Sequence, residues 1–186
     1  MRNLFFRQDQ LGSCGNNVVI GRTVRIRYPE FVHLGDNCII DDYTYISTGL
    51  VMDGYGHIAA GCKLIGGKAC TVRLGQFSTF APNVVISAGT DDYRGGIATP
   101  FVPSELKREA QYSDIIFGRH CIVGANSVVL PFAEFGEGAA LGALSLAKGK
   151  LSPWSLYAGI PARKIADRDK RYTLAATKKF KLRQAI

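Results

Sequence analysis

Five apolar residues in the C-terminal half of the chain are spaced six apart without a slip: Phe117, Val123, Val129, Phe135 and Leu141. A small residue follows each of these anchors four positions later: Cys121, Ser127, Ala133, Ala139 and Ser145. A period of six matches neither an α-helix nor a half-buried strand, which repeat near 3.6 and at 2 residues. It matches short flat strands with a corner every six residues, so that three sixes close one triangular coil. Stacked coils place each anchor about 4.8 Å from the next, which predicts a parallel β-helix.

The same spacing continues upstream through eleven further apolar anchors: Ile20, Ile26, Leu34, Ile40, Ile46, Met52, Ile58, Leu64, Leu74, Phe80 and Ile86. The register slips before Leu34 and before Leu74, as expected where a corner carries extra residues. About fifteen sixes predict roughly five coils, which exceeds the three that a solenoid needs. Cys38, Cys62 and Cys121 occupy the small-residue position of their coils, which indicates packed thiols rather than disulfides.

The rhythm stops between Ile86 and Ile116. Segment 89–114 contains acidic, basic and aromatic residues together. An irregular segment longer than about 15 residues in a compact domain is usually functional or disordered. We expect an excursion loop that projects from a rigid prism and binds a ligand.

The C-terminal end differs in composition from the repeats. Residues 166–186 are expected to form a short basic helical extension beyond a β-helix domain at 1–165, with Leu174, Phe180 and Leu182 on its buried side. The net charge of +8 is concentrated in this region. It favours a polyanionic small ligand or peripheral contact with an acidic membrane surface. No nucleic-acid motif accompanies it, and no membrane-spanning run or secretion leader is apparent, so we expect a cytoplasmic protein.

Four blocks within residues 74–165 are together similar to one known family. They are LGQFSTFAPNVVIS at 74–87, the loop at 89–114, IVGANSVVLP at 122–131 and YAGIPARKI at 157–165. Their order and spacing resemble the hexapeptide-repeat acyltransferases, in particular the branch of galactoside, maltose and surface-polysaccharide O-acetyltransferases. Beyond these blocks, nearly the whole chain shares the repeat pattern.

The resemblance implies an all-β solenoid of the left-handed parallel β-helix type that assembles as a homotrimer. It also implies an enzyme that moves an acetyl group from its co-substrate acetyl-CoA to a sugar hydroxyl, in lipopolysaccharide- or capsule-type synthesis. Two alternatives stay open. The chain is an N-acetyltransferase acting on a nucleotide-linked amino sugar, or it is an inactive β-helix that only binds.

One residue departs from the family pattern. The family's general base is a histidine a few residues into the loop, and Asp91 occupies that place here. Imidazole suits the role because its pKa lies near neutrality, whereas a carboxyl group with its usual pKa of about 4 is a weaker base. Asp91 is the base if it is desolvated or placed beside Asp92. Otherwise His57 or a histidine of a neighbouring subunit serves, or an amine acceptor needs no protein base.

The loop supplies further candidates for binding the sugar acceptor. They are Asp92, Tyr93, Arg94 and Lys107, together with His57 if its coil aligns with the loop.

The resemblance also implies a donor site. In this family the pantetheine arm lies between adjacent prisms at corners with small side chains, and Ala125 and Ala143 match those corners. Lys148, Arg163 and Lys164 fall where the family places basic groups for the phosphates of CoA, which suits charge-assisted contacts.

The three histidines lie 24 and 63 residues apart. This spacing disfavours the three-histidine zinc site of a β-helical carbonic anhydrase, and we expect no metal. We interpret His120 as an outward-facing surface residue, His33 as part of a turn and His57 as a corner residue. Trp154 is expected in the core or in an interface.

Overall fold

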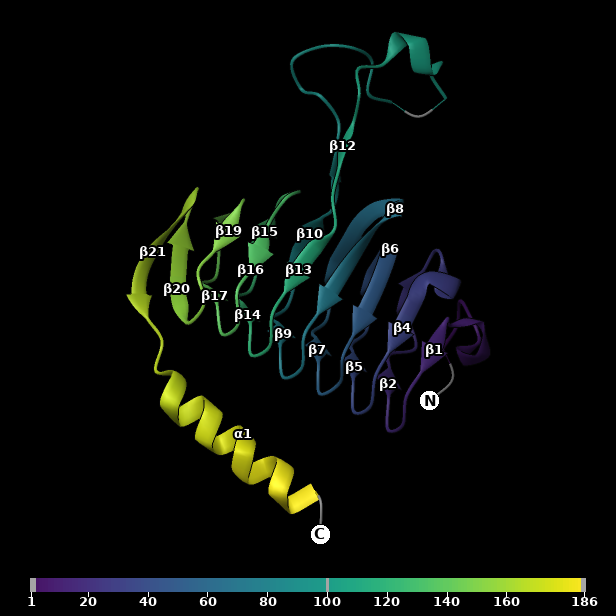
Figure 1. The fold of residues 1–186 in the computed structure, drawn as a ribbon. Coiled ribbons are helices and arrows are strands. Elements are labelled where there is room, and N and C mark those ends of the chain that lie inside the picture. The colour runs from purple at the N-terminus through teal and green to yellow at the C-terminus, as the bar shows by residue number, and fades with distance from the viewer. Residues whose placement is uncertain (1–2, 100, 185–186) are drawn as a thin grey trace.

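The computed structural model describes residues 3–99 and 101–184 and confirms the predicted all-β solenoid. Short parallel strands stack into a triangular prism with three flat faces (Figure 1). Face 1 contains one strand of every coil: β2 (Val19–Ile20), β5 (Ile39–Ile40), β7 (His57–Ile58), β9 (Thr79–Phe80), β14 (Ile122–Val123), β17 (Ala140–Leu141) and β20 (Ser155–Gly159).

The other two faces share two long strands that bend through a corner, β6 (Tyr45–Met52) and β8 (Lys63–Leu74). Face 2 also contains β3 (Arg25–Ile26), β10 (Val85–Ser87), β15 (Val128–Val129) and β18 (Leu146–Ala147). Face 3 also contains β1 (Ser13–Cys14), β4 (Val32–Leu34), β13 (Ile115–Phe117), β16 (Glu134–Phe135) and β19 (Lys150–Leu151).

The prism has about seven coils, so the predicted five was too few. The anchors counted in the sequence end at Ile20 and Leu141, whereas pairing continues to β1 on one side and to β20 on the other. The first and last coils lack a full set of apolar anchors, because one side of each faces no further coil. A six-residue pattern therefore misses them.

The interior is filled by the predicted anchors. Phe117 is 2% exposed and packs between the rings of Phe80 and Phe135, with ring centroids 4.8 and 4.5 Å apart. The small-residue position also behaves as expected, because Cys38, Cys62 and Cys121 are fully buried and free. Small side chains are needed there because the chain turns sharply inside the corner.

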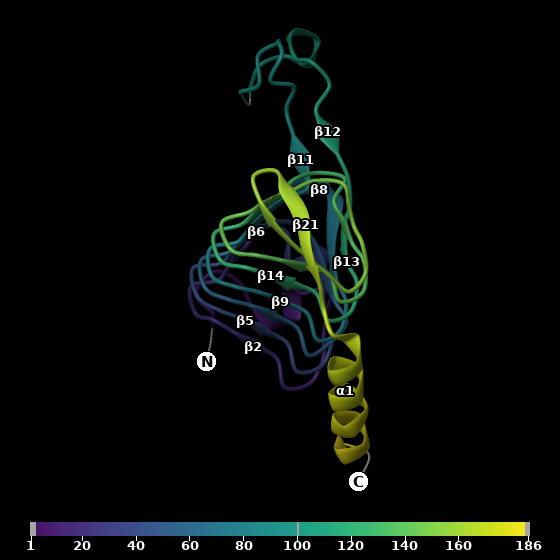
Figure 2. The same ribbon diagram turned by 90° about the vertical axis from the view of Figure 1, so that its left-hand side faces the viewer.

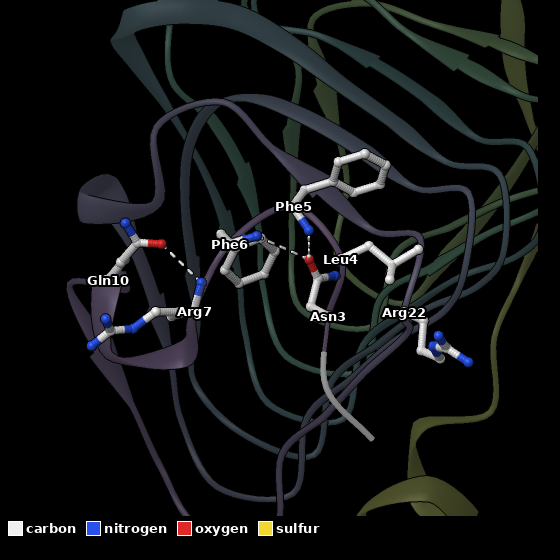
Figure 3. A pocket seen from close by; sticks show the side chains of 7 residues that line it. All are labelled: Asn3, Leu4, Phe5, Phe6, Arg7, Gln10 and Arg22. Atoms are coloured by element: carbon white, nitrogen blue, oxygen red, sulfur yellow. Dashed lines mark hydrogen bonds between the residues drawn. The ribbon is translucent and has the colours of Figure 1, made fainter.

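The N-terminal segment closes one end of the prism. At the start, the Asn3 amide nitrogen donates to the carbonyl oxygens of Gly21 and Val24, each at 2.8 Å. Its oxygen accepts the backbone N–H groups of Phe5 and Phe6 (Figure 3). The hollow drawn there therefore belongs to a structural cap.

The remaining elements are two at the C-terminal end, two strands in the loop and three short turns. They are β21 (Ala162–Asp167), α1 (Lys170–Gln184), β11 (Gly89–Thr90), β12 (Gln111–Tyr112) and the 3-10 turns η1 (Gln8–Gln10), η2 (Pro29–Phe31) and η3 (Ser104–Leu106). Strand β21 pairs antiparallel with β20 and covers the last coil. The expected helical extension from residue 166 thus begins later, at Lys170, and its residues 185–186 lie outside the described range.

Helix α1 lies along one corner of the prism (Figures 1 and 2). Of the three residues expected on its buried side, Phe180 packs against the rings of Tyr55 and Phe77. Leu174 and Leu182 are 40% and 60% exposed, so the expectation is wrong for these two residues. The helix follows a corner instead of closing the last coil, so only a narrow strip of it meets the prism.

The histidine assignments also need correction. His120 is buried, whereas an outward surface position was predicted. It occupies a corner with a backbone φ of +61°, and its ring lies between Phe77 and Trp154. His33 lies in β4 and His57 in β7, since the residue before an anchor is a strand position whose side chain points outward.

Replacing Phe117 with Ala is expected to lower the free energy of unfolding by about 3–5 kcal/mol, because the surrounding rings cannot close the cavity. The neighbouring outward residue Ile116, 44% exposed, is the matched control, and Ile116→Ala should change it by less than about 1 kcal/mol. Denaturant unfolding of both variants measures the difference. Equal effects would contradict the assignment of the inner face.

Candidate active site

The excursion loop leaves the corner between faces 2 and 3 as a two-stranded arm and projects far from the prism (Figures 1 and 2). Its base is the antiparallel pair β11 and β12, with Gly89 opposite Tyr112. The Asp114 carboxylate accepts the backbone N–H of Thr71 at 2.8 Å and lies 3.7 Å from the Arg73 side chain. The base is therefore tied to β8, which belongs to the preceding coil.

Asp92 organises the arm. Its carboxylate accepts the backbone N–H of Arg94 at 2.8 Å and lies 3.1 Å from a guanidinium nitrogen of Arg108. The Arg94 guanidinium approaches the same carboxylate at 3.3 Å. These hydrogen bonds, the backbone one first, lower the pKa of Asp92 to about 2. The side chain is 16% exposed and joins the two strands of the arm.

Several predicted acceptor residues line one open hollow beside this carboxylate. The hollow is lined by Asp91, Asp92, Tyr93 and Arg94, which follow β11, by residues 108–112, which lead into and include β12, and by Phe132 from the next coil. Asp91 and Tyr93 are both exposed to solvent. The arrangement offers carboxylates, a guanidinium and aromatic rings to a polar ligand.

Two predicted acceptor contacts lie elsewhere. Lys107 is half-buried and does not line the hollow. His57 lies on face 1, where its Nε2 is 2.9 Å from an Asp41 carboxylate oxygen and its Nδ1 is 3.4 Å from the Thr79 hydroxyl. Within one protomer, the structure does not bring His57 to Asp91.

Sequence reasoning missed several residues of the hollow, among them Arg108, Tyr112 and Phe132. Arg108 and Tyr112 come from the returning part of the loop, Arg108 before β12 and Tyr112 within it, and they meet Asp92 and Gly89 only because the loop folds back on itself. Phe132 belongs to a later coil, with a backbone φ of +65° and a side chain that is 57% exposed. A large apolar residue directly after Pro131, where the repeat has a corner, was the one available signal.

Ala125 and Ala143, which were predicted to form the donor site, lie at the corner between faces 1 and 2. Ala125 and Ala143 stack in adjacent coils, where the carbonyl oxygen of Ala125 accepts the backbone N–H of Leu144 at 2.9 Å. A Cβ on Gly124 would lie 2.3 Å from the Ala143 nitrogen, so only glycine fits between these coils. The side chains at this corner are therefore small.

The three predicted phosphate-binding cations lie on different elements. Lys148 is exposed in the corner after β18, and Arg163 and Lys164 are exposed on β21. Lys164 lies 2.7 Å from the Asp167 carboxylate, and this hydrogen bond raises the pKa of the lysine. The pairing leaves Lys164 less available to a ligand than an unpaired lysine.

Two kinds of feature, a cluster of metal ligands and a membrane-spanning helix, are absent from residues 3–99 and 101–184. In this range no three His, Cys, Asp or Glu side chains gather as a metal site requires. The helices of the same range lack the length and the apolar content needed to span a bilayer.

Known proteins share this architecture over nearly its full length. A dTDP-4-amino-4,6-dideoxy-D-glucose acyltransferase of Escherichia coli is 33% identical over 164 residues, which cover 86% of this chain and 83% of that protein. The chain belongs to the hexapeptide-repeat sugar acyltransferases. No family model matches the sequence.

Other members of the family extend the comparison. AntD, an N-acyltransferase from Bacillus cereus solved with dTDP and 3-hydroxybutyryl-CoA, superposes with a TM-score of 0.87 at 30% identity, covering 98% of this chain and 99% of AntD. Galactoside O-acetyltransferase of Escherichia coli K12 is 28% identical over 76% of this chain and 68% of its own length. This sugar acyltransferase therefore has relatives that differ in the acceptor atom.

In this acyltransferase, Asp92→Asn should loosen the arm, because a neutral amide cannot hold two guanidinium groups equally well. We expect faster hydrogen exchange across residues 90–112 and unchanged exchange in β8 and β13. Since the pKa of Asp92 is depressed to about 2, the protection should persist as pH falls through 4 and fade only towards about 2.

Asp91→Asn is the matched control, since this neighbouring carboxylate is exposed and makes no side-chain ion pair in the described structure. It should leave the exchange of the arm unchanged. Equal loosening by both variants would contradict the organising role of Asp92.

Proposed function

We propose that this protein transfers an acyl group from acyl-CoA to the amine of a nucleotide-linked amino sugar. The observation that carries the proposal is the chemistry of the loop hollow, where carboxylates take the place that an imidazole base holds in the family's O-acetyltransferases. The three histidines of the chain lie in β4, in β7 and in a corner beneath α1. An uncharged amine attacks a thioester more readily than a hydroxyl does, so it needs a weaker base.

Similarity to particular relatives supports the same acceptor. The Escherichia coli relative is named for dTDP-4-amino-4,6-dideoxy-D-glucose, and an AntD variant was solved with dTDP-4-amino-4,6-dideoxyglucose and coenzyme A. The O-acetyltransferase predicted from the sequence is the second candidate. The galactoside enzyme and a putative lipopolysaccharide O-acetyltransferase, 28% and 26% identical to this chain, favour it.

Different residues of the chain would bind the two substrates. Acyl-CoA would lie along the small-residue corner at Ala125 and Ala143, with its phosphates towards Lys148, Arg163 and Lys164. The amino sugar would enter the loop hollow, where Asp91 binds the amine and receives its proton. Tyr93 and Arg94 would contact the sugar nucleotide, and Asp92 holds the arm in place.

The transfer itself needs one bond made and one broken. The amine nitrogen attacks the thioester carbonyl, its proton passes to Asp91, and the tetrahedral oxyanion is stabilised by backbone N–H donors. The carbon–sulfur bond then breaks, and the CoA thiolate takes up a proton from solvent. Alignment of the two substrates supplies much of the acceleration, since a thioester is already activated.

We also propose that the site is completed in a homotrimer. In one protomer the hollow is open, and Tyr93 is 94% exposed. A groove between adjacent prisms would supply the second wall that both substrates need.

The direct test compares two acceptors that differ in one atom. With acetyl-CoA, release of CoA should be faster with dTDP-4-amino-4,6-dideoxyglucose than with dTDP-6-deoxyglucose, which carries a hydroxyl at that carbon. We expect kcat/KM values to differ by at least about a hundredfold, because a site built around an amine leaves its polar groups unpaired with the wrong ligand. Preference for the hydroxyl sugar would replace this proposal by the O-acetyltransferase.

Asp91→Asn is the control for the proton acceptor in that assay. Loss of a general base lowers kcat by about a hundredfold or more, whereas a binding contact changes mainly KM. Unchanged kcat between about pH 6 and pH 8 would show that Asp91 does not take the proton, and that the amine loses it to solvent.

A further inference from the structure

Four aromatic rings lie in a row along the corner between faces 3 and 1, three of them stacked in successive coils and the fourth beyond Gly138. Phe77 lies between Tyr55 and His120, with ring centroids 5.0 and 5.3 Å apart and nearly parallel planes. The His120 ring centroid lies 6.0 Å from that of Trp154, which belongs to the coil after next. All four residues have positive φ angles between 51° and 61°, because the same turn recurs in each coil. We call this set the corner stack.

Helix α1 rests on the corner stack. The Phe180 ring meets Tyr55 and Phe77 edge-on, with centroids 5.3 and 6.0 Å apart. The Lys181 ammonium lies 5.8 Å from the centre of the Phe77 ring. Figures 1 and 2 show that α1 follows β21 through one short connection and runs beside this corner. The side chains of Phe180 and Lys181 hold the helix there.

His120 lies under this helix in an unusual environment. His120 lines an open surface hollow beside α1, together with Leu174 and Thr177 of the helix. The residue is 5% exposed, and its Nε2 atom is buried without a hydrogen-bond partner among the described residues. Burial is the first cause that lowers the pKa of this imidazole, and the charge of Arg119 is the second. The packing thus suits a neutral ring.

The charged groups around His120 are mostly cationic. Arg119 precedes it in the chain and pairs with Glu137 of the next coil at 3.0 Å. Arg168, which follows β21, donates to the His120 carbonyl oxygen at 3.0 Å. Lys178 and Lys181 of α1 line the same open hollow as His120. Glu137 is already paired, and α1 carries no acidic residue at all. A proton on the imidazole would add a positive charge among four cationic side chains, offset only in part by the Glu137 carboxylate, which already pairs with Arg119.

We propose that the corner stack is a pH-sensitive docking site for α1. The helix is docked while His120 is neutral and undocks when His120 takes up a proton. Undocking of α1 lets the imidazolium reach water and separates it from the two lysines of the helix. The direction follows from linkage. A histidine that is harder to protonate in the docked state favours docking above its usual titration range and opposes it as the pH falls through about 6.5.

The sole tryptophan makes the event observable, since Trp154 is part of the stack. Its fluorescence and the hydrogen exchange of residues 170–184 are measured in the full chain between about pH 8 and pH 5, with labelling times scaled to the intrinsic exchange rate. We expect α1 to lose protection by at least about tenfold on acidification, while β14 and β17 keep theirs. Protection that does not change with pH would overturn the proposal.

Matched variants assign the effect to one side chain. His120→Phe keeps an aromatic ring in a turn that Phe77 already adopts, and His120→Asn places there the residue that Asn37 provides in an earlier coil with φ +58°. Both remove the titrating group, so α1 should stay docked at low pH in whichever variant folds. His33→Phe changes an exposed histidine and should leave the transition intact.

Phe180→Ala sets the reference for an undocked helix and should release α1 at every pH. The proposal fails if His120→Phe or His120→Asn folds and still shows the wild-type pH dependence. It also fails if His33→Phe removes that dependence.

Discussion

Backbone hydrogen bonds between successive coils are the constraint on which the rest of this structure depends. The N–H groups of Ile122 and Gly124 donate to Ala139 and Leu141 of the next coil at 3.1 and 2.8 Å. Pairing of this kind fixes the register, so each interior side chain meets its equivalent one coil away. A side chain that fits in one coil must therefore fit between its two neighbours. The interior accordingly repeats Ile, Leu, Val and Phe.

The same constraint explains how an arm of more than twenty residues is tolerated. Strand β8 pairs with β10 through Lys63–Ile65 and with β13 through Val72–Leu74. Both strands that flank the arm are thus held by one strand of the preceding coil. The loop leaves and re-enters at fixed points, and Asp92 and Asp114 order its base. A rigid prism can in this way present a hollow of acidic, basic and aromatic side chains without using its core for chemistry.

The sequence was sufficient for the parts of the molecule that repeat. Anchors such as Val123 and Phe135 are buried because a period of six leaves no other fold for them, and the loop boundaries follow from the loss of that period. The sequence was insufficient to predict the environment of a side chain whose neighbours come from distant coils. His120 follows an outward pattern locally, yet Phe77, Trp154 and α1 enclose it. Arg108 reaches Asp92 only through the hairpin, which no local signal marks.

The acceptor chemistry depends on where the thioester meets the loop, and a crystal structure of the protein with coenzyme A and dTDP-4-amino-4,6-dideoxyglucose measures this most directly. The account predicts the pantetheine arm beside Ala125 and Ala143, with the sulfur and the sugar nitrogen in contact next to Asp91. Coenzyme A bound away from that corner, or a sugar amine remote from the loop, would contradict it.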